Sequence, residues 1–329
     1  MKALVTGGCG FIGSHLVERL LREGCEVVVL DNLSTGRPEN LKEIQGHPQL
    51  RRIEADVTER AAIQDYFKGV DVVFHLAALA DIVPSIQRPF DYYHANVTGT
   101  VTVLESARAA GVKRFMYTAS SSCYGMAEIF PTPETAPLQP EYPYALTKYL
   151  GEQIALHWGK VYKMQVVSLR LFNVYGPRSR TTGTYGAVMG VFLAQKLANK
   201  PLTIVGDGTQ RRDFTYVTDV AEAFWMASCS NLYGEILNVG SGETYSVNQL
   251  AKLIGGPAIS IPKRPGEPDC TFADITQIVR HLGWHPHVSF ESGVKQMLGR
   301  ISEWSDAPVW TPESIASATK EWFDYLAVS

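Results

Sequence analysis

Residues 2–13, KALVTGGCGFIG, open the chain with a short apolar strand, Lys2 to Thr6, that runs directly into closely spaced glycines. A helical pattern follows the glycines and ends at Gly24. Glycines at this spacing allow a tight turn, a close approach of backbone N–H groups to a pyrophosphate, and close packing of the helix on the strand. The segment therefore predicts a strand, turn and helix that hold a dinucleotide, with three glycines at the cofactor: Gly7, Gly10 and Gly13.

The next apolar strand, Glu26 to Leu30, is followed at once by Asp31. A carboxylate at the tip of this strand can accept hydrogen bonds from the adenosine ribose of a dinucleotide. The same charge repels a ribose phosphate, so the sequence favours NAD over NADP. Arg37 lies nearby in the sequence and leaves NADP open as the alternative.

Strands and helices continue to alternate over the first half of the chain, which predicts an α/β fold with a doubly wound parallel sheet covered on both faces. Ligands of such sheets bind at the carboxyl ends of the strands, although small residues there are also typical of simple turns. The expected strands are Arg52–Asp56, Asp71–Leu76, Arg114–Thr118 and Gln165–Phe172, and the expected helices are Ala61–Phe67 and Pro89–Ala110. The candidate ligand-binding residues just past the strand ends are Asp56, Val57, Leu76, Ala77, Ala78, Thr118, Ser120, Ser121 and Ser122.

The stretch 142–152, YPYALTKYLGE, places Tyr144 and Lys148 four residues apart in a helix-forming run, so both side chains share one helix face. A phenol is a poor base near neutral pH unless a nearby positive charge favours the phenolate, and Lys148 can supply that charge. Pro143 suits the first helical turn, which places Tyr144 near the positive end of the helix dipole. The alternative is an ordinary amphipathic helix that happens to carry a tyrosine and a lysine.

After Phe172 the alternation breaks, and a second lobe is expected. We expect residues 1–174, joined by 213–240, to form the dinucleotide-binding domain, and residues 175–212 and 241–329 to form a smaller, interleaved α+β substrate lobe. Its arginines are candidates to bind phosphate, because a guanidinium matches phosphate oxygens well, but each could equally be a surface arginine. The expected elements are a loop at 179–186, helices at Val188–Leu197, Val217–Ala227 and from Thr311 to Leu326, and strands at Leu202–Val205 and Ile236–Val239; the arginines are Arg211, Arg212 and Arg264.

Composition narrows the class of protein. The 329-residue chain is 45% hydrophobic and 19% charged, with a net charge of −3 and no Lys/Arg block, which favours a small-molecule substrate over nucleic acid or a membrane. No long apolar segment is present at the start, so we expect a cytoplasmic protein. The five cysteines form no C-x-x-C pair, and we expect reduced thiols that mostly serve in packing. The histidines at 281, 285 and 287 lack further ligands at suitable spacing, so no metal site is expected.

A series of short motifs runs in order along nearly the whole chain: Thr6-Gly7-x-x-Gly10-Phe11-Ile12-Gly13, Asp31-Asn32, Leu76-Ala77-Ala78, Ser120-Ser121-Ser122-x-Tyr124-Gly125, Tyr144-x-x-x-Lys148, Asn173-Val174-Tyr175-Gly176-Pro177-Arg178, Gly206-Asp207-Gly208-x-x-x-Arg212-Asp213-Phe214 and Arg264-Pro265-Gly266-Glu267. Together they resemble the extended short-chain dehydrogenase/reductase family, in its nucleotide-sugar epimerase and dehydratase group. The chain is most similar to 4-epimerases of UDP-hexoses or UDP-N-acetylhexosamines. The resemblance implies a Rossmann-like sheet with a smaller interleaved lobe that binds the nucleotide sugar.

The resemblance also implies roles for individual residues. Tyr144, as phenolate, would take the proton from the sugar 4-hydroxyl while hydride leaves C4 for NAD; Lys148 would hold the nicotinamide ribose and lower the phenol pKa, and Ser120 would bond the same oxygen. The cofactor set also includes Phe11, Ile12, Asn32 and Asn96 beside the residues named above. The implied substrate contacts are Ser85, Ser121, Ser122, Asn173, Arg178, Val188, Arg212, Arg264 and Thr271.

Two departures narrow the reaction and the substrate. Dehydratases of the group carry carboxylates just after the serine or threonine, and this chain has Ser121 and Ser122 there, which disfavours dehydration and decarboxylation and favours 4-epimerisation. The small Thr271 occupies a position that is a bulky aromatic in UDP-galactose 4-epimerases that reject N-acetyl sugars, so an enlarged sugar could fit.

Two other functions stay open: a C4 dehydrogenase that releases the 4-keto sugar, and a catalytically idle NAD-binding protein. The resemblance further implies a homodimer formed through the helices at Pro89–Ala110 and Tyr142–Tyr162. Neither the nucleotide base nor the sugar follows from the sequence.

Overall fold

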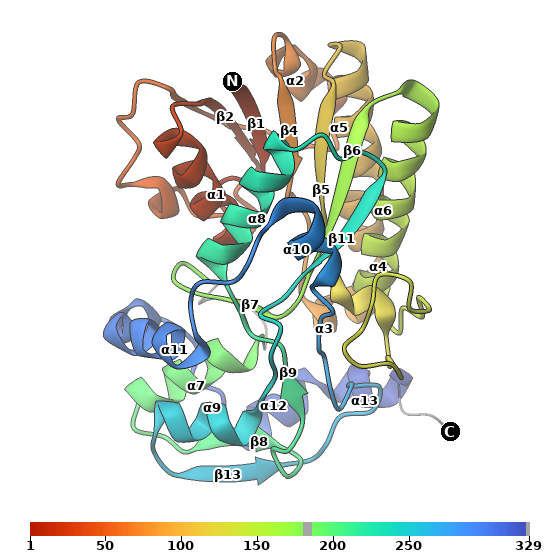
Figure 1. Cartoon of the computed structure of the whole chain (residues 1–329). Coiled ribbons are helices and arrows are strands. Elements are labelled where there is room, and N and C mark those ends of the chain that lie inside the picture. Colours follow the sequence, from red (N-terminus) through yellow and green to blue (C-terminus); the bar gives the residue numbers. More distant parts are fainter. Residues whose placement is uncertain (180–185, 327–329) are drawn as a thin grey trace.

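A parallel sheet organises the first lobe (Figure 1). The computed structural model describes residues 1–179 and 186–326. In this part of the chain seven strands pair in the order β11-β6-β5-β4-β1-β2-β3, all parallel. The strands are β1 (Lys2–Thr6), β2 (Glu26–Asp31), β3 (Leu50–Glu54), β4 (Val72–His75), β5 (Arg114–Ser120), β6 (Gln165–Leu171) and β11 (Glu235–Val239). The order reverses between β1 and β4, which is where such sheets bind ligands. The predicted α/β doubly wound sheet is confirmed.

Helices cover both faces of this sheet because its strands are apolar at successive positions. On β1, for example, Val5 lies in a core with α1 (Phe11–Arg22), α8 (Val217–Cys229) and α10 (Thr276–Leu282). Its neighbour Leu4 points to the opposite face and packs in a second core with α2 (Arg60–Ile63), α5 (Gly99–Ala109) and α6 (Pro143–Tyr162). Short elements connect these layers: η1 (Pro38–Leu41), η2 (Gln64–Phe67), α3 (Ile82–Gln87), α4 (Pro89–Tyr93), η3 (His94–Thr98) and η4 (Ser121–Tyr124).

The predicted helix at 89–110 is interrupted. Its middle turn, η3, is π-helical and separates α4 from α5. The buried Asn96 lies in this turn and binds both backbone groups of Leu79, accepting from its N–H at 2.8 Å and donating to its carbonyl at 3.0 Å. A π-helical turn inside a helix is frequent at functional sites, because it re-aims side chains.

The second lobe has its own apolar core, built from Phe192, Leu250, Met297 and their neighbours. Its elements are β7 (Val174–Tyr175), α7 (Val188–Leu197), β8 (Leu202–Val205), β9 (Arg211–Arg212), β10 (Thr215–Tyr216), β12 (Tyr245–Ser246), α9 (Val247–Ile254), β13 (Ala258–Ile261), α11 (Phe290–Gly299), η5 (Ile301–Trp304), α12 (Pro312–Ala318) and α13 (Lys320–Leu326). Three small sheets pair β7 with β10, β9 with β12, and β8 with β13.

The separate cores support the division into two interleaved lobes, which we keep as a proposal. α8 and β11, within 213–240, pack in the first lobe. α10 also packs there, so the range 241–329 contributes to both lobes. Most of the loop predicted at 179–186 lies outside the described residues, and the helix predicted from Thr311 to Leu326 is divided between α12 and α13.

A buried ion pair fastens α6 to the sheet. Glu152 of α6 and Arg170 of β6 are each 1% exposed and are joined by two hydrogen bonds, Nη2 to Oε1 at 2.6 Å and Nε to Oε2 at 3.0 Å. The Ser168 hydroxyl donates to the same carboxylate at 2.8 Å. Arg170 also donates to the Tyr124 hydroxyl (2.8 Å) and the Glu134 carbonyl (3.1 Å). Since both charges are paired and bonded, the pair holds α6 at one position on the sheet.

We expect loss of either partner to destabilise the fold strongly. Glu152→Gln or Arg170→Met leaves one buried charge without its counterion, and the free energy of unfolding should fall by about 3–5 kcal/mol. Urea unfolding followed by circular dichroism measures this. The control is Asp65→Asn, which breaks the exposed ion pair with Lys68 and should cost less than about 1 kcal/mol. Similar small losses in all three variants would contradict a central role for the buried pair.

Candidate functional site

The glycine turn lies at the carboxyl end of β1 and has no room for side chains. Gly10 N–H donates to the Gly7 carbonyl at 3.0 Å. A Cβ at Gly13 would lie 2.1 Å from that carbonyl oxygen, and a Cβ at Gly7 (φ +70°) would lie 2.8 Å from the Ala77 nitrogen. The turn is therefore pressed against residues 76–78 at the end of β4, as close backbone approach to a pyrophosphate requires.

Asp31 ends β2 next to this turn. Its carboxylate accepts from the backbone N–H groups of Cys9 and Leu33, both at 2.9 Å. Burial raises the pKa of Asp31, and these two hydrogen bonds oppose that shift. The carboxylate thus helps to hold the glycine turn in place. It also lies at the end of β2, where we expect the adenosine ribose of the dinucleotide to bind.

The neighbouring strand end carries a second carboxylate. Asp56 accepts from Asn32 Nδ2 at 2.7 Å and from the Thr58 backbone N–H at 2.8 Å. Burial acts against ionisation, but the hydrogen bonds from Thr58 and Asn32 outweigh it and lower the pKa of Asp56. Val57 beside it is buried. Asn32, Asp56 and Val57 therefore form one edge of the predicted adenosine end.

Two of the predicted cofactor residues, Thr118 and Asn96, differ in whether their polar side-chain atoms already have hydrogen-bond partners. Thr118 of β5 has a buried hydroxyl with no hydrogen-bond partner among the described residues, so it can serve a bound molecule. Asn96 has its amide occupied by Leu79 and by the Thr147 hydroxyl (2.9 Å). We assign Asn96 to holding the loop after β4 in place. Together, the tight turn and the free Thr118 hydroxyl fit a dinucleotide.

Tyr144 and Lys148 lie in the first turns of α6, which begins at Pro143 as predicted. Lys148 is 4% exposed, and its ammonium nitrogen lies 4.7 Å from the centroid of the Tyr117 ring. Burial lowers the pKa of Lys148 to about 7, while the charge of Glu152 one turn along raises it. Burial raises the pKa of Tyr144, and a hydrogen bond with Ser120 lowers it. Near neutral pH Lys148 can therefore change its protonation state, whereas Tyr144 in the ligand-free protein stays a neutral phenol.

The last residue of β5, Ser120, is hydrogen-bonded to Tyr144. Ser120 Oγ, at the strand end, accepts from the Ser122 hydroxyl at 2.9 Å and from its backbone N–H at 3.2 Å. Ser121 lies between them, half-buried in η4. The backbone and hydroxyl of Ser122 thus orient Ser120 toward the phenol.

Two of the predicted phosphate-binding arginines meet at one carboxylate. Arg212 Nη2 lies 2.9 Å from Glu267 Oε1, and Arg264 Nη1 lies 3.5 Å from Glu267 Oε2. All three side chains are largely buried. Arg211 turns away and donates through Nε to the Thr244 hydroxyl at 2.7 Å. Two converging guanidiniums are what a diphosphate needs.

Thr271 and Asn173 also meet, with the threonine hydroxyl donating to Asn173 Oδ1 at 2.6 Å. The remaining candidates make contacts of their own within the protein. The Arg178 guanidinium contacts Glu18 of α1, and no contact among the described residues joins it to Arg212 or Arg264. The Ser85 hydroxyl donates to the Ile82 carbonyl within α3 (2.6 Å), and Val188 packs against the second core.

Sequence reasoning missed several residues around the site. Tyr142 stacks on Tyr144, with ring centroids 6.4 Å apart and an interplanar angle of 11°. Trp322, near the end of the chain, contacts both Tyr142 and Arg264. The position of Tyr142 two residues before Tyr144 is a signal that could have been used. Nothing in the sequence pattern connects Trp322 to the site.

Within residues 1–179 and 186–326, no group of three or more His, Cys, Asp or Glu side chains is placed to hold a metal ion. In the same ranges no helix has the length and apolar character needed to cross a membrane.

Comparison with known proteins identifies the family. Residues 3–240 match the model of the NAD-dependent epimerase/dehydratase family. UDP-glucose 4-epimerase of Mycolicibacterium smegmatis is 37% identical over 304 residues, covering 89% of this chain and 96% of the relative. UDP-glucuronic acid decarboxylase 1 of Arabidopsis thaliana is 33% identical over 309 residues, covering 91% of this chain and 69% of the relative. The solved UDP-N-acetylglucosamine 4-epimerase of Methanobrevibacter ruminantium, in complex with UDP-N-acetylmuramic acid, is 31% identical with a TM-score of 0.87, covering 92% of this chain and 98% of that one.

We expect Gly13→Ala to weaken NAD binding at least about tenfold, because the new methyl group would displace the Gly7 carbonyl and widen the turn. Isothermal titration with NAD measures the Kd. The control is Gly46→Ala, where nothing lies within 4 Å of the new Cβ. An unchanged Kd in a folded Gly13→Ala protein would show that the turn does not hold the cofactor.

Proposed function

Because the chain belongs to the NAD-dependent epimerase/dehydratase family, we propose that it is a UDP-sugar 4-epimerase that acts through a transient 4-keto sugar. The observation that carries this proposal is the contact between Ser120 and Tyr144 beside a buried Lys148, with serines and no carboxylate at 121 and 122. NAD, the cofactor of the family, would accept the hydride from C4 of the sugar, and its reduced form would later return a hydride to C4.

The protein's own groups handle the proton. Tyr144, as phenolate, takes the proton of the sugar 4-hydroxyl and returns it after the keto sugar has turned over. Ser120 bonds the same oxygen, and the Ser122 hydroxyl holds Ser120 in place at 2.9 Å. Lys148 favours the phenolate by its charge and holds the cofactor ribose. The remaining cofactor contacts we propose are those predicted from the sequence, apart from Asn96: Gly7, Gly10, Phe11, Ile12, Gly13, Asp31, Asn32, Asp56, Val57, Leu76, Ala77, Ala78 and Thr118.

Dehydration and decarboxylation are disfavoured although a decarboxylase is among the relatives. Elimination of water needs a further acid and base near C5 and C6, and residues 121 and 122 supply only hydroxyls. The main rival stays the C4 dehydrogenase that releases its 4-keto product, because it needs the same Ser120, Tyr144 and Lys148.

For the substrate we propose a UDP-hexose whose 2-substituent can be an N-acetyl group. UDP-glucose and UDP-N-acetylglucosamine 4-epimerases are both among the similar proteins. Thr271 is small and its hydroxyl donates to Asn173 Oδ1 (2.6 Å), and we propose that a side chain of this size admits a larger 2-substituent. Arg212 and Arg264 are proposed to bind the diphosphate in place of Glu267.

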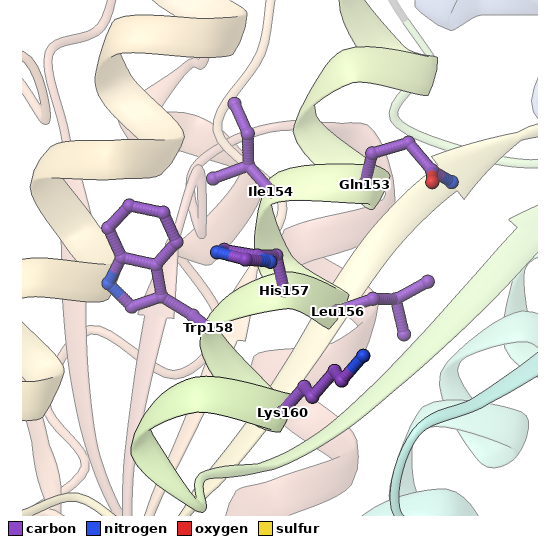
Figure 2. A pocket seen from close by; sticks show the side chains of 6 residues that line it. All are labelled: Gln153, Ile154, Leu156, His157, Trp158 and Lys160. Atoms are coloured by element: carbon purple, nitrogen blue, oxygen red, sulfur yellow. The ribbon is translucent and has the colours of Figure 1, made fainter.

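We also propose a homodimer formed through α4 and α6. These helices contact each other and expose large apolar side chains, including Phe90 (76%), Tyr93 (50%) and Val161 (48%). A shallow pocket lies on α6 (Figure 2), lined by Gln153, Ile154, Leu156, His157, Trp158 and Lys160. Exposed apolar side chains grouped on neighbouring helices are typical of an interface.

Purified protein should interconvert UDP-glucose and UDP-galactose, or their N-acetyl counterparts, as followed by proton NMR of the sugar. Tyr144→Phe should lower kcat at least about 100-fold, because the base is lost. Lys148→Met removes the charge that favours phenolate, so the acid limb of the pH–kcat profile should move to higher pH. Tyr233→Phe, at an exposed tyrosine, is the control. Accumulation of a 4-keto product with no C4 epimer would support the dehydrogenase instead.

The dimer proposal predicts a mass of twice one chain at micromolar concentration in sedimentation analysis. The double variant Phe90→Glu and Val161→Glu should shift the mass to one chain, since it places charges in an apolar interface. The control Ile259→Glu changes an exposed residue of β13 in the other lobe. A wild-type monomer would be evidence against the interface.

A further inference from the structure

The C-terminal helix α13 reaches the candidate site through one side chain, Trp322. This indole is 4% exposed, and its N–H donates to the Pro265 carbonyl at 2.7 Å. The Arg264 guanidinium carbon lies 5.6 Å from the centroid of the Trp322 ring, a cation–π arrangement. Trp322 therefore contacts the loop that carries Arg264 at two points, the Pro265 carbonyl and the Arg264 guanidinium.

Trp322 also contacts Tyr142, and Tyr142 in turn stacks on Tyr144. The Tyr142 ring centroid lies 6.3 Å from that of Trp322 and 6.4 Å from that of Tyr144. Tyr142 is hydrogen-bonded to Ser122 and feels the charges of Glu267 and Arg212. It thus lies between the proposed reacting end and the proposed diphosphate end. A row of three aromatic rings connects α13 to Tyr144.

α13 also packs against α3, the short helix that carries Ser85. The tail therefore touches three separate segments around the site: α3, the start of α6 and the Arg264 loop (Figure 1). Such a bridge fixes the spacing of elements that are otherwise joined only through long stretches of chain.

The surroundings of Trp322 differ from those of the other buried tryptophans. Trp284 and Trp304 lie in the apolar cores of the two lobes. None of the four apolar cores of the described residues includes Trp322, and its polar contacts include the Arg264 guanidinium and the Pro265 carbonyl. Trp284 also donates to a carbonyl, that of Asp219 at 3.0 Å, so the contact with the Arg264 guanidinium is what distinguishes Trp322 from it. A tryptophan that positions a binding residue needs such a contact.

We propose that Trp322 is a positioning residue of the substrate site, which holds Arg264 against the diphosphate of the nucleotide sugar and backs Tyr142 beside the sugar. The proposal rests on the UDP-sugar epimerase function above. The C-terminal helix then completes the substrate pocket and has no part in NAD binding. Loss of the indole removes one of the contacts that hold the Arg264 guanidinium, beside its ion pair with Glu267, so diphosphate binding weakens while the Tyr144 chemistry persists.

Calorimetric titration of the full-length protein with UDP and with NAD separates these effects. Trp322→Leu should raise the Kd for UDP and the KM for the UDP-sugar about tenfold, with the Kd for NAD unchanged and kcat within about threefold. Trp322→Phe keeps an aromatic face for Arg264 and should recover most of the UDP affinity. Trp310→Leu makes the same change elsewhere in the tail and should leave UDP binding unchanged. Thermal melting of each variant confirms that it is folded.

The outcomes distinguish this inference from the proposed function. Epimerase activity with normal UDP affinity in Trp322→Leu would overturn the positioning role and leave the function intact. Trp322-dependent UDP binding without C4 inversion would support the role and remove the function. Equal losses of UDP and NAD affinity, an equal effect of Trp310→Leu, or a wild-type protein that does not bind UDP would each count against Trp322 as a positioning residue.

Discussion

The ion pair between Glu152 and Arg170 is the constraint on which the site depends. It lies in the interior, two turns along α6 from Tyr144, and it joins that helix to β6 with charge-assisted hydrogen bonds. Because a buried charge is costly without its partner, α6 has one favourable position on the sheet. That position brings Tyr144 to the Ser120 end of β5 and places Lys148 over Tyr117. The same carboxylate raises the pKa of Lys148, so one residue supports both the geometry and the electrostatics of the site.

Burial is the largest influence on the pKa values of Tyr144 and Lys148. It raises the pKa of Tyr144 and lowers that of Lys148, so the ligand-free protein disfavours the charged form of each. Ser120 acts in the opposite direction by its hydrogen bond with the phenol. The phenol is therefore neutral in the ligand-free protein near pH 7, and we propose that the charge of Lys148 must favour phenolate before Tyr144 can act as a base.

In the second lobe, ion pairs and an aromatic ring organise the proposed diphosphate site. Arg212 and Arg264 converge on Glu267, whose single negative charge offsets part of their combined positive charge. Trp322 supports this arrangement from the end of the chain, and Tyr142 links it to Tyr144. The proposed diphosphate and proton-transfer ends are therefore connected by packed aromatic rings, which fix their separation more rigidly than the loops that carry them could do alone.

The sequence by itself determined the features that depend on neighbouring residues. The glycine turn, the strand and helix alternation, and Tyr144 with Lys148 on one helix face follow from local backbone constraints and helix spacing, and the family and its NAD cofactor followed from the order of such motifs. Only the tertiary structure decided which distant residues meet: Glu152 with Arg170, Arg212 with Arg264 through Glu267, and Trp322 with Tyr142. It also decided that Asn96 lies in a π-helical turn and binds Leu79. These contacts carry no periodic signal, because they arise from the packing of the whole chain and from the free energy of pairing buried polar groups.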